Sequence, residues 1–136
     1  MSATCTEDAL RALGAEVSAF ASINPDAFVS AVLGREREAS TALPIGVAIP
    51  HARIAELERI VVGLGIAPKG IDWSGQEVHA LFLMAVPTSQ ATAYLMLVQR
   101  LAKLLRDKQR LDELKSFKDE EECRAWLAKY MNLALE

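Results

Sequence analysis

The chain has 136 residues, of which 51% are hydrophobic and 24% charged, and its formal net charge is −3. This length and composition are those of an ordinary globular protein, and we expect one domain over residues 1–136. The chain has no basic run of the kind that marks nucleic-acid binding. No uncharged apolar stretch approaches the roughly 20 residues that a membrane-spanning helix needs. These features exclude nucleic acid as an expected partner, and they exclude direct membrane insertion.

The N-terminus and the cysteines indicate where the protein works. Residues 1–8 lack the basic start and apolar run of a signal peptide, so we expect a cytoplasmic protein. Cys5 and Cys123 are too far apart in sequence for a CxxC site and too few for a disulfide framework. Both are therefore interpreted as ordinary thiols.

Two helices are predicted at the start of the chain. Thr6 stands as an N-cap residue ahead of two acidic residues, which suit the start of a helix. Apolar residues then recur at helical spacing and are expected on its buried face, namely Leu10, Leu13, Val17 and Phe20. Pro25 follows Asn24 at the first position of a second helix that ends near Arg37. The expected buried residues of this helix are Phe28, Val29, Val32 and Leu33.

The middle of the chain has the composition of strands. Residues 47–49 form a short apolar run, and residues 60–66 are rich in β-branched side chains and end before Pro68. Residues 69–75 have turn composition. Residues 78–86 are almost all apolar, which is typical of a strand that is covered on both faces.

Helical patterns return after these strands. Residues 91–106 predict a long helix whose apolar face is formed by Leu95, Val98, Leu101, Ala102 and Leu105. Residues 109–114 extend or restart it, and Ser116 resembles the first residue of a capping box for a last helix. That helix is expected to direct Cys123, Trp126, Leu127 and Tyr130 inward. Helices that alternate with buried strands in this way argue for a layered α/β fold.

His51 is the most informative residue. It follows the apolar run 47–49 and Pro50, so a short strand is expected to deliver one imidazole to a loop at the rim of a sheet. A neutral imidazole can attack phosphorus and hold a phosphoryl group through nitrogen. A histidine in a loop is more often an ordinary surface residue, so His51 alone does not decide between these readings.

The residues upstream of His51 suit phosphate chemistry. The planar guanidinium of Arg35 matches phosphate oxygens. The hydroxyls of Ser40 and Thr41 are able to donate hydrogen bonds, as are backbone N–H groups around Gly46. The candidate site therefore consists of Arg35, Ser40, Thr41, Gly46 and His51.

The same segment resembles the active-site signature of a known family. The enzyme IIA proteins of the bacterial sugar phosphotransferase system, fructose/mannitol type with its nitrogen-regulatory branch, carry Arg-Glu, then Ser-Thr, then a turn and Gly-[Ile/Val]-Ala-Ile-Pro-His. This chain has Arg35-Glu36, Ser40-Thr41 and, over residues 46–51, Gly-Val-Ala-Ile-Pro-His. The likeness extends over residues 26–133.

The resemblance implies a mannitol-type IIA fold, which is a single-domain α/β sandwich with a mixed central sheet flanked by helices. It implies that His51 accepts a phosphoryl group from a phosphohistidine carrier protein and passes it to a IIB component of a sugar permease. Arg35 would steady the phosphate, and Ser40 and Thr41 would shape the pocket. No cofactor and no metal are implied. The alternative is a regulatory IIA-like module whose phosphorylation state controls binding to another target protein.

Two departures from the family pattern bear on the site. The family usually has a second histidine at the start of the long helix, where this chain has Tyr94, so a phenol is expected in the pocket. The family's turn is rich in glycine, whereas here only Gly46 remains, so residues 42–45 are expected to follow a different path. His79 is interpreted as a structural histidine, with a replacement for the second histidine as the less favoured reading. A zinc site formed by His51 and His79 lacks further ligands.

Overall fold

The computed structural model describes residues 5–117 and 119–131, which divide by packing into two compact units, Met1–Ala91 and Thr92–Glu136. The first unit carries a β-sheet and two helices, and the second unit is helical. One domain over residues 1–136 stays a prediction.

The first unit begins with the two predicted helices, α1 (Thr6–Ala21) and α2 (Pro25–Glu38). Asn24 caps α2 as the sequence indicates, because its side chain accepts a hydrogen bond of 3.0 Å from the backbone nitrogen of Ala27. The predicted cap of α1 is wrong. Thr6 is already helical, and its hydroxyl donates to the carbonyl of Asp72, 3.3 Å away.

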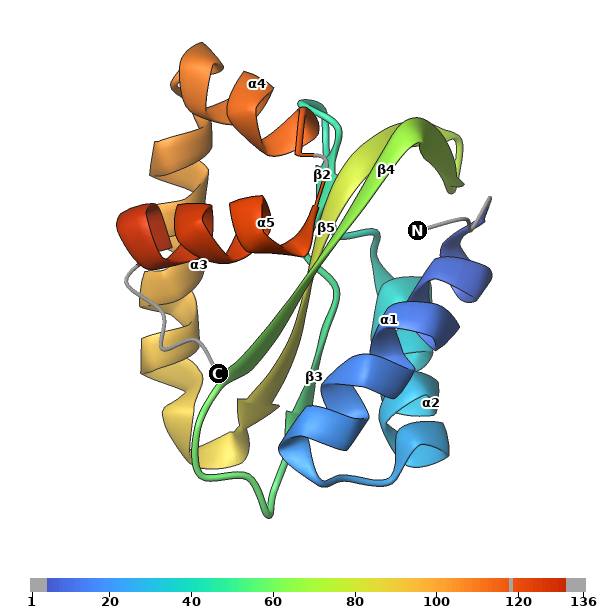
Figure 1. Cartoon of the computed structure of the whole chain (residues 1–136). Helices are drawn as coiled ribbons and strands as arrows, with labels where there is room; N and C mark the ends of the chain where they lie inside the picture. Colours follow the sequence, from blue (N-terminus) through green and yellow to red (C-terminus); the bar gives the residue numbers. More distant parts are fainter. Residues whose placement is uncertain (1–4, 118, 132–136) are drawn as a thin grey trace. The chain divides into compact units, whose positions relative to one another are not determined.

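The apolar faces of these helices are mostly as predicted. Leu10, Leu13 and Val17 of α1 are buried, as are the four residues predicted for α2. Phe20 is 57% exposed, so its predicted burial is wrong. Figure 1 shows α1 and α2 side by side on the same face of the sheet. This pair covers the sheet and carries Arg35 and Glu36 in its last helical turn.

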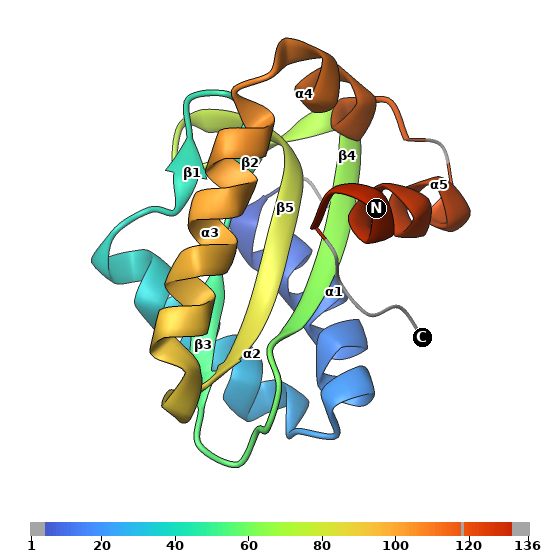
Figure 2. The ribbon, with the colours of Figure 1, turned by 90° about the vertical axis from the view of Figure 1, so that its left-hand side faces the viewer.

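Among the described residues the sheet has five strands, and its mixed direction is as predicted. Its strands are β1 (Ala42–Leu43), β2 (Val47–Ala48), β3 (His51–Ile54), β4 (Val61–Trp73) and β5 (Gln76–Pro87). The strand β5 is central, because β2 and β3 pair with it in parallel and β4 pairs with it antiparallel (Figure 2). The strand β1 pairs antiparallel with β2. After β5 a single 3₁₀ turn, η1 (Thr88–Gln90), leads out of the unit.

The hairpin formed by β4 and β5 differs from the prediction. The strand β4 does not end before Pro68 but continues to Trp73, with a register shift between Ile66 and Ile71. Pro68 lies within that irregular part and is exposed, where the ladder does not require its missing N–H group. The predicted turn shrinks to Ser74 and Gly75, which both have positive φ, at 54° and 90°. This backbone geometry suits a two-residue hairpin turn.

The strands β2 and β3 lie one after the other along the same edge of β5. Val47 pairs with Ala80, and His51 pairs with Met84. Pro50 separates the two strands because it has no N–H group, although its carbonyl still accepts from Met84 at 3.0 Å. The loop predicted for His51 is therefore wrong, since His51 is the first residue of β3 and pairs with Met84 of β5.

The core of the first unit lies between the helix pair and the sheet. Its largest fully buried side chains include Leu10, Phe28, Ile71, Trp73 and Leu81. In β5 the residues from Ala80 to Pro87 are all buried, which confirms the predicted strand with both faces covered.

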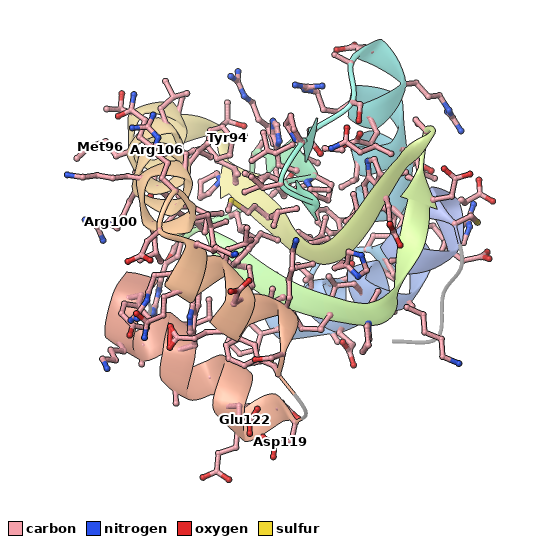
Figure 3. The ribbon with its side chains drawn as sticks, turned by 90° about the horizontal axis from the view of Figure 1, so that it is seen from above. Tyr94, Met96, Arg100, Arg106, Asp119 and Glu122 are labelled. Carbon is pink, nitrogen blue, oxygen red and sulfur yellow. The ribbon has the colours of Figure 1, made fainter. Side chains whose placement is uncertain are left out.

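The second unit contains α3 (Ala91–Leu105), which begins at the unit boundary, then α4 (Lys108–Lys115), α5 (Glu120–Trp126) and a π-helical turn, η2 (Leu127–Met131). Leu101 and Leu105 are buried as predicted, but Leu95 is 58% exposed. Met96 and Arg100 lie on the same side of α3, as residues four apart do (Figure 3).

The last helix begins later than its capping-box prediction. Asp119, and not Ser116, is its N-cap, and its carboxylate accepts from the nitrogen of Glu122 at 2.9 Å. Trp126 and Leu127 are buried, whereas Cys123 and Tyr130 are half-buried. No helix among the described residues is long and apolar enough to cross a membrane.

Candidate functional site

The residues predicted for the site, except Tyr94, all lie in the first unit. Arg35 is in the last turn of α2, and Ser40 and Thr41 form the link from α2 to β1. Gly46 closes the turn between β1 and β2, and His51 begins β3. One continuous segment therefore joins a helix end to three strands of the sheet.

The imidazole of His51 is held in one orientation. Its Nδ1 lies 3.4 Å from the carbonyl oxygen of Ile49. A carbonyl only accepts hydrogen bonds, so Nδ1 is the protonated nitrogen of the neutral ring, and the lone pair is on Nε2. The ring is half-buried at the start of β3.

The charge state of His51 follows from its surroundings. Burial lowers the pKa of His51 below its ordinary value, because desolvation disfavours the charged imidazolium. The positive charges of Arg35 and Arg53 also lower this pKa, whereas the Ile49 carbonyl and the Glu36 carboxylate raise it. The net lowering keeps His51 neutral at pH 7, and the neutral ring is the nucleophilic form.

Arg35 is held against its own helix end. Its NH1 donates to the carbonyl of Ala39, 2.9 Å away. A guanidinium has five N–H donors, so this bond fixes the side chain and uses only a part of its capacity. Its charge acts on His51, which places Arg35 in the electrostatic environment of the imidazole.

Glu36 makes several polar contacts in this segment, although its only signal in the sequence is its place in the motif. Its carboxylate accepts from the backbone nitrogen of Thr41 at 2.9 Å and from the Thr41 hydroxyl at 2.5 Å. It also accepts from the indole nitrogen of Trp73 at 3.1 Å. The hydroxyl proton of Thr41 is thus used within the protein, so Thr41 shapes this segment through Glu36.

The turn before β2 is a tight turn, and a path different from that of a glycine-rich loop stays a prediction. Leu43 accepts a hydrogen bond of 3.0 Å from the nitrogen of Gly46, with Pro44 at the second turn position. This arrangement matches the residue preferences of a tight β-turn. Gly46 has φ of 88°, so the one glycine that remains is at the position that needs it. Ser40 accepts from the nitrogen of Ala42 at 3.2 Å and is exposed.

Tyr94 belongs to the second unit, in the first turn of α3, where it is half-buried. Its place in a pocket with His51 stays a prediction.

His79 is not a second site histidine. Its Nδ1 contacts the carbonyl of Ala67 at 3.2 Å, and its Nε2 lies 3.4 Å from a carboxylate oxygen of Glu77. His79 is five residues from Met84, the partner of His51, which is roughly 16 Å along a strand. This spacing supports the structural reading. Among the described residues, no three His, Cys, Asp or Glu side chains converge as metal ligands.

Comparison with known proteins assigns a family to this chain. The family model described as phosphoenolpyruvate-dependent sugar phosphotransferase system, EIIA 2, matches residues 1–130. The chain belongs to this family. The EIIA 2 membership confirms the resemblance that the segment 35–51 carries, and it makes the chain a phosphotransfer component.

Related EIIA 2 proteins include regulatory and sugar-specific members. A nitrogen regulatory protein of Bradyrhizobium diazoefficiens is 32% identical over 116 residues, which are 83% of this chain and 76% of that protein. The fructose-specific EIIABC component of Bacillus subtilis is 33% identical over 82 residues, which are 58% of this chain and 13% of that protein. The chain thus spans only a small part of this larger relative.

Solved structures confirm the fold of this EIIA 2 chain. The nitrogen regulatory protein IIA-Ntr of Neisseria meningitidis has a TM-score of 0.85 at 24% identity, over 93% of this chain and 89% of that one. IIA mannitol of Escherichia coli has a TM-score of 0.78 at 20% identity, over 94% of this chain and 92% of that one. The mannitol-type IIA fold predicted from the sequence is therefore correct.

Proposed function

We propose that this EIIA 2 protein is a phosphoryl carrier and that His51 is its acceptor. The observation that carries the proposal is the state of the His51 imidazole. It is neutral at pH 7, its Nδ1 proton is engaged by the Ile49 carbonyl, and the guanidinium charge of Arg35 acts on it. A neutral, oriented nitrogen beside a cation is what an in-line attack on phosphorus requires.

The proposed step is a displacement at phosphorus. The lone pair on Nε2 of His51 attacks the phosphoryl group of a phosphohistidine on the donor. The new N–P bond forms as the donor's N–P bond breaks, and the donor imidazole leaves with that electron pair. His51 keeps its Nδ1 proton, and Arg35 stabilises the charge on the transferring oxygens. In the second step a cysteine thiolate of the acceptor attacks phosphorus, and the pair of the breaking N–P bond returns to Nε2.

The remaining site residues have supporting roles in this proposal. Ser40 and backbone N–H groups near Gly46 donate to phosphate oxygens, and Thr41 shapes the pocket. Tyr94 replaces the second histidine with a phenol that donates one hydrogen bond and carries no positive charge. No cofactor is required.

The proposed partners are other proteins. The donor is a phosphohistidine carrier protein, and the acceptor is a IIB component of a sugar permease. The solved complex of mannitol enzyme IIA with phosphorylated enzyme IIB from Escherichia coli supports a IIB acceptor. We propose that the exchange occurs in the cytoplasm. The family match spans both units, which supports one functional domain.

A regulatory role is the second candidate. The match to a nitrogen regulatory protein over 83% of the chain favours it, and so does Tyr94 in place of histidine. In this version phosphorylation of His51 controls binding to a target protein, and the phosphoryl group is not passed to a sugar permease.

Labelling tests both versions. The protein is incubated with phosphoenolpyruvate, the upstream kinase and the carrier protein, and the modified residue is mapped by mass spectrometry under alkaline conditions. We expect an acid-labile, base-stable label that His51→Ala abolishes and the matched variant His79→Ala retains. A label that survives the loss of His51 refutes the proposal. The two roles are separated by adding a IIB protein to the labelled protein. Transfer of the label to a IIB cysteine supports the carrier, and its absence supports the regulator.

A further inference from the structure

Glu36 connects three parts of the first unit. Its carboxylate, near the C-terminal end of α2, accepts from the backbone nitrogen and the hydroxyl of Thr41 and from the indole of Trp73. Trp73 is the last residue of β4 and is 37 residues away in sequence. One side chain therefore ties a helix end, the link to β1 and the end of the longest strand.

The contact with Trp73 restrains the carboxylate. Trp73 is 1% exposed, and a buried indole N–H that loses its acceptor costs about 1–3 kcal/mol. Rotation of Glu36 toward solvent would leave this N–H unpaired. The carboxylate is therefore held where Thr41 meets it, and hydrogen bonds to a charged acceptor are the stronger kind.

The contact with Thr41 restrains Arg35 in turn. Thr41 ends a three-residue link that starts at Ala39, whose carbonyl accepts from NH1 of Arg35. A shift of this link would move the acceptor that orients the guanidinium. The polar chain therefore runs from Trp73 through Glu36 and Thr41 to Ala39 and Arg35, whose charge acts on His51.

We propose that Glu36 is a positioning residue for phosphoryl transfer, which fixes the link 39–41 and through it the Arg35 guanidinium. The inference rests on the proposed function of His51. The hydrogen bonds of Glu36 described above are made to groups of this chain, and the proposal assigns it no contact with the phosphoryl donor. Its removal is therefore expected to slow the transfer step and to leave the binding of the donor unchanged.

The test compares Glu36→Gln with Glu38→Gln, which removes the same charge from the exposed last residue of α2. Single-turnover labelling of His51 is measured over a range of phosphorylated carrier concentrations and is normalised to folded protein. We expect the maximal rate of Glu36→Gln to fall roughly 10- to 100-fold, as misplacement of a catalytic group by about 1 Å does. The half-saturating carrier concentration is expected to stay within about twofold of wild type.

A second pair of variants keeps the inference testable if Glu36→Gln folds poorly. Thr41→Val removes the hydroxyl but keeps the shape, and Thr41→Ser restores the hydroxyl. We expect slower transfer in the first and recovery in the second. Equal rates for these two variants, or for Glu36→Gln and Glu38→Gln, would overturn the inference while His51 is still labelled. Wild-type protein that takes no label at His51 would instead overturn the proposed function.

Discussion

Two glycines in the helix pair should respond in opposite ways to the same substitution. Gly14 of α1 is buried, and a Cβ atom there would lie 2.6 Å from Cγ2 of Val29 on α2. At Gly34 of α2, no atom of the described residues lies within 4 Å of the position that a Cβ would take, apart from the adjacent backbone of its own helix. Replacement of a helical glycine by alanine stabilises a helix by about 1 kcal/mol when the space is open.

The expected free energies follow from these surroundings. Gly34→Ala should raise the free energy of unfolding by about 1 kcal/mol. Gly14→Ala gains the same helix term but forces a methyl group against Val29, a stiff β-branched side chain that is 5% exposed. Overpacking of this kind costs about 1–3 kcal/mol, so the net effect is a loss of about 1 kcal/mol. The two variants should thus differ by about 2 kcal/mol.

Urea unfolding followed by far-UV circular dichroism measures this difference. With a slope of about 2 kcal/mol per molar urea, the two midpoints should lie about 1 M apart on opposite sides of wild type. Val29→Ala should relieve Gly14→Ala, so the double variant should be more stable than the sum of the single changes by about 1 kcal/mol. Midpoints that move in the same direction, or strictly additive effects, would refute this account of helix packing.

Three further outcomes are expected. Gly46→Ala should lower the free energy of unfolding by about 1–3 kcal/mol, because alanine is strained at φ of 88°, and wild-type stability in the variant would contradict this. The pKa of His51 is lowered in the folded state, so the unfolded chain binds more protons between that pKa and 6.5, and stability rises with pH in this window. The difference in free energy of unfolding between wild type and His51→Gln should be constant above pH 6.5. Below pH 6.5 the wild type should lose stability relative to the variant. A constant difference down to pH 5 would exclude the lowered pKa. Burial and then the Glu122 carboxylate raise the pKa of Cys123, so iodoacetamide at pH 8 should alkylate exposed Cys5 several-fold faster, and equal rates by mass spectrometry would contradict this.

Local signals in the sequence predicted much of the first unit. Asn24 and Pro25 indicate the start of α2 because capping depends on adjacent residues. The apolar run of β5 predicts a strand covered on both faces. Pro68 misled the prediction of β4, because proline ends a central strand but is tolerated at an irregular, exposed part of an edge strand.

The site was only partly predictable, because local sequence patterns do not show which distant residues come into contact. The motif residues of the segment 35–51 could be found from their order, but the strand that His51 begins exists only through its pairing with β5. The bond from Trp73 to Glu36 spans 37 residues, and no local pattern predicts a contact at that separation. The only available signal was the place of Glu36 next to Arg35 in the motif.

The pairing of His51 with Met84 has a consequence for how two proteins meet. An imidazole at the start of a strand that is bonded to the most buried strand of its sheet has little freedom to swing outward. In the proposed mechanism the donor must therefore bring its phosphorus to a stationary nitrogen of His51, and the acceptor must bring its thiolate to the phosphorus held there. In that mechanism the binding surfaces of the donor protein and of the acceptor protein must each be complementary to the same region around His51.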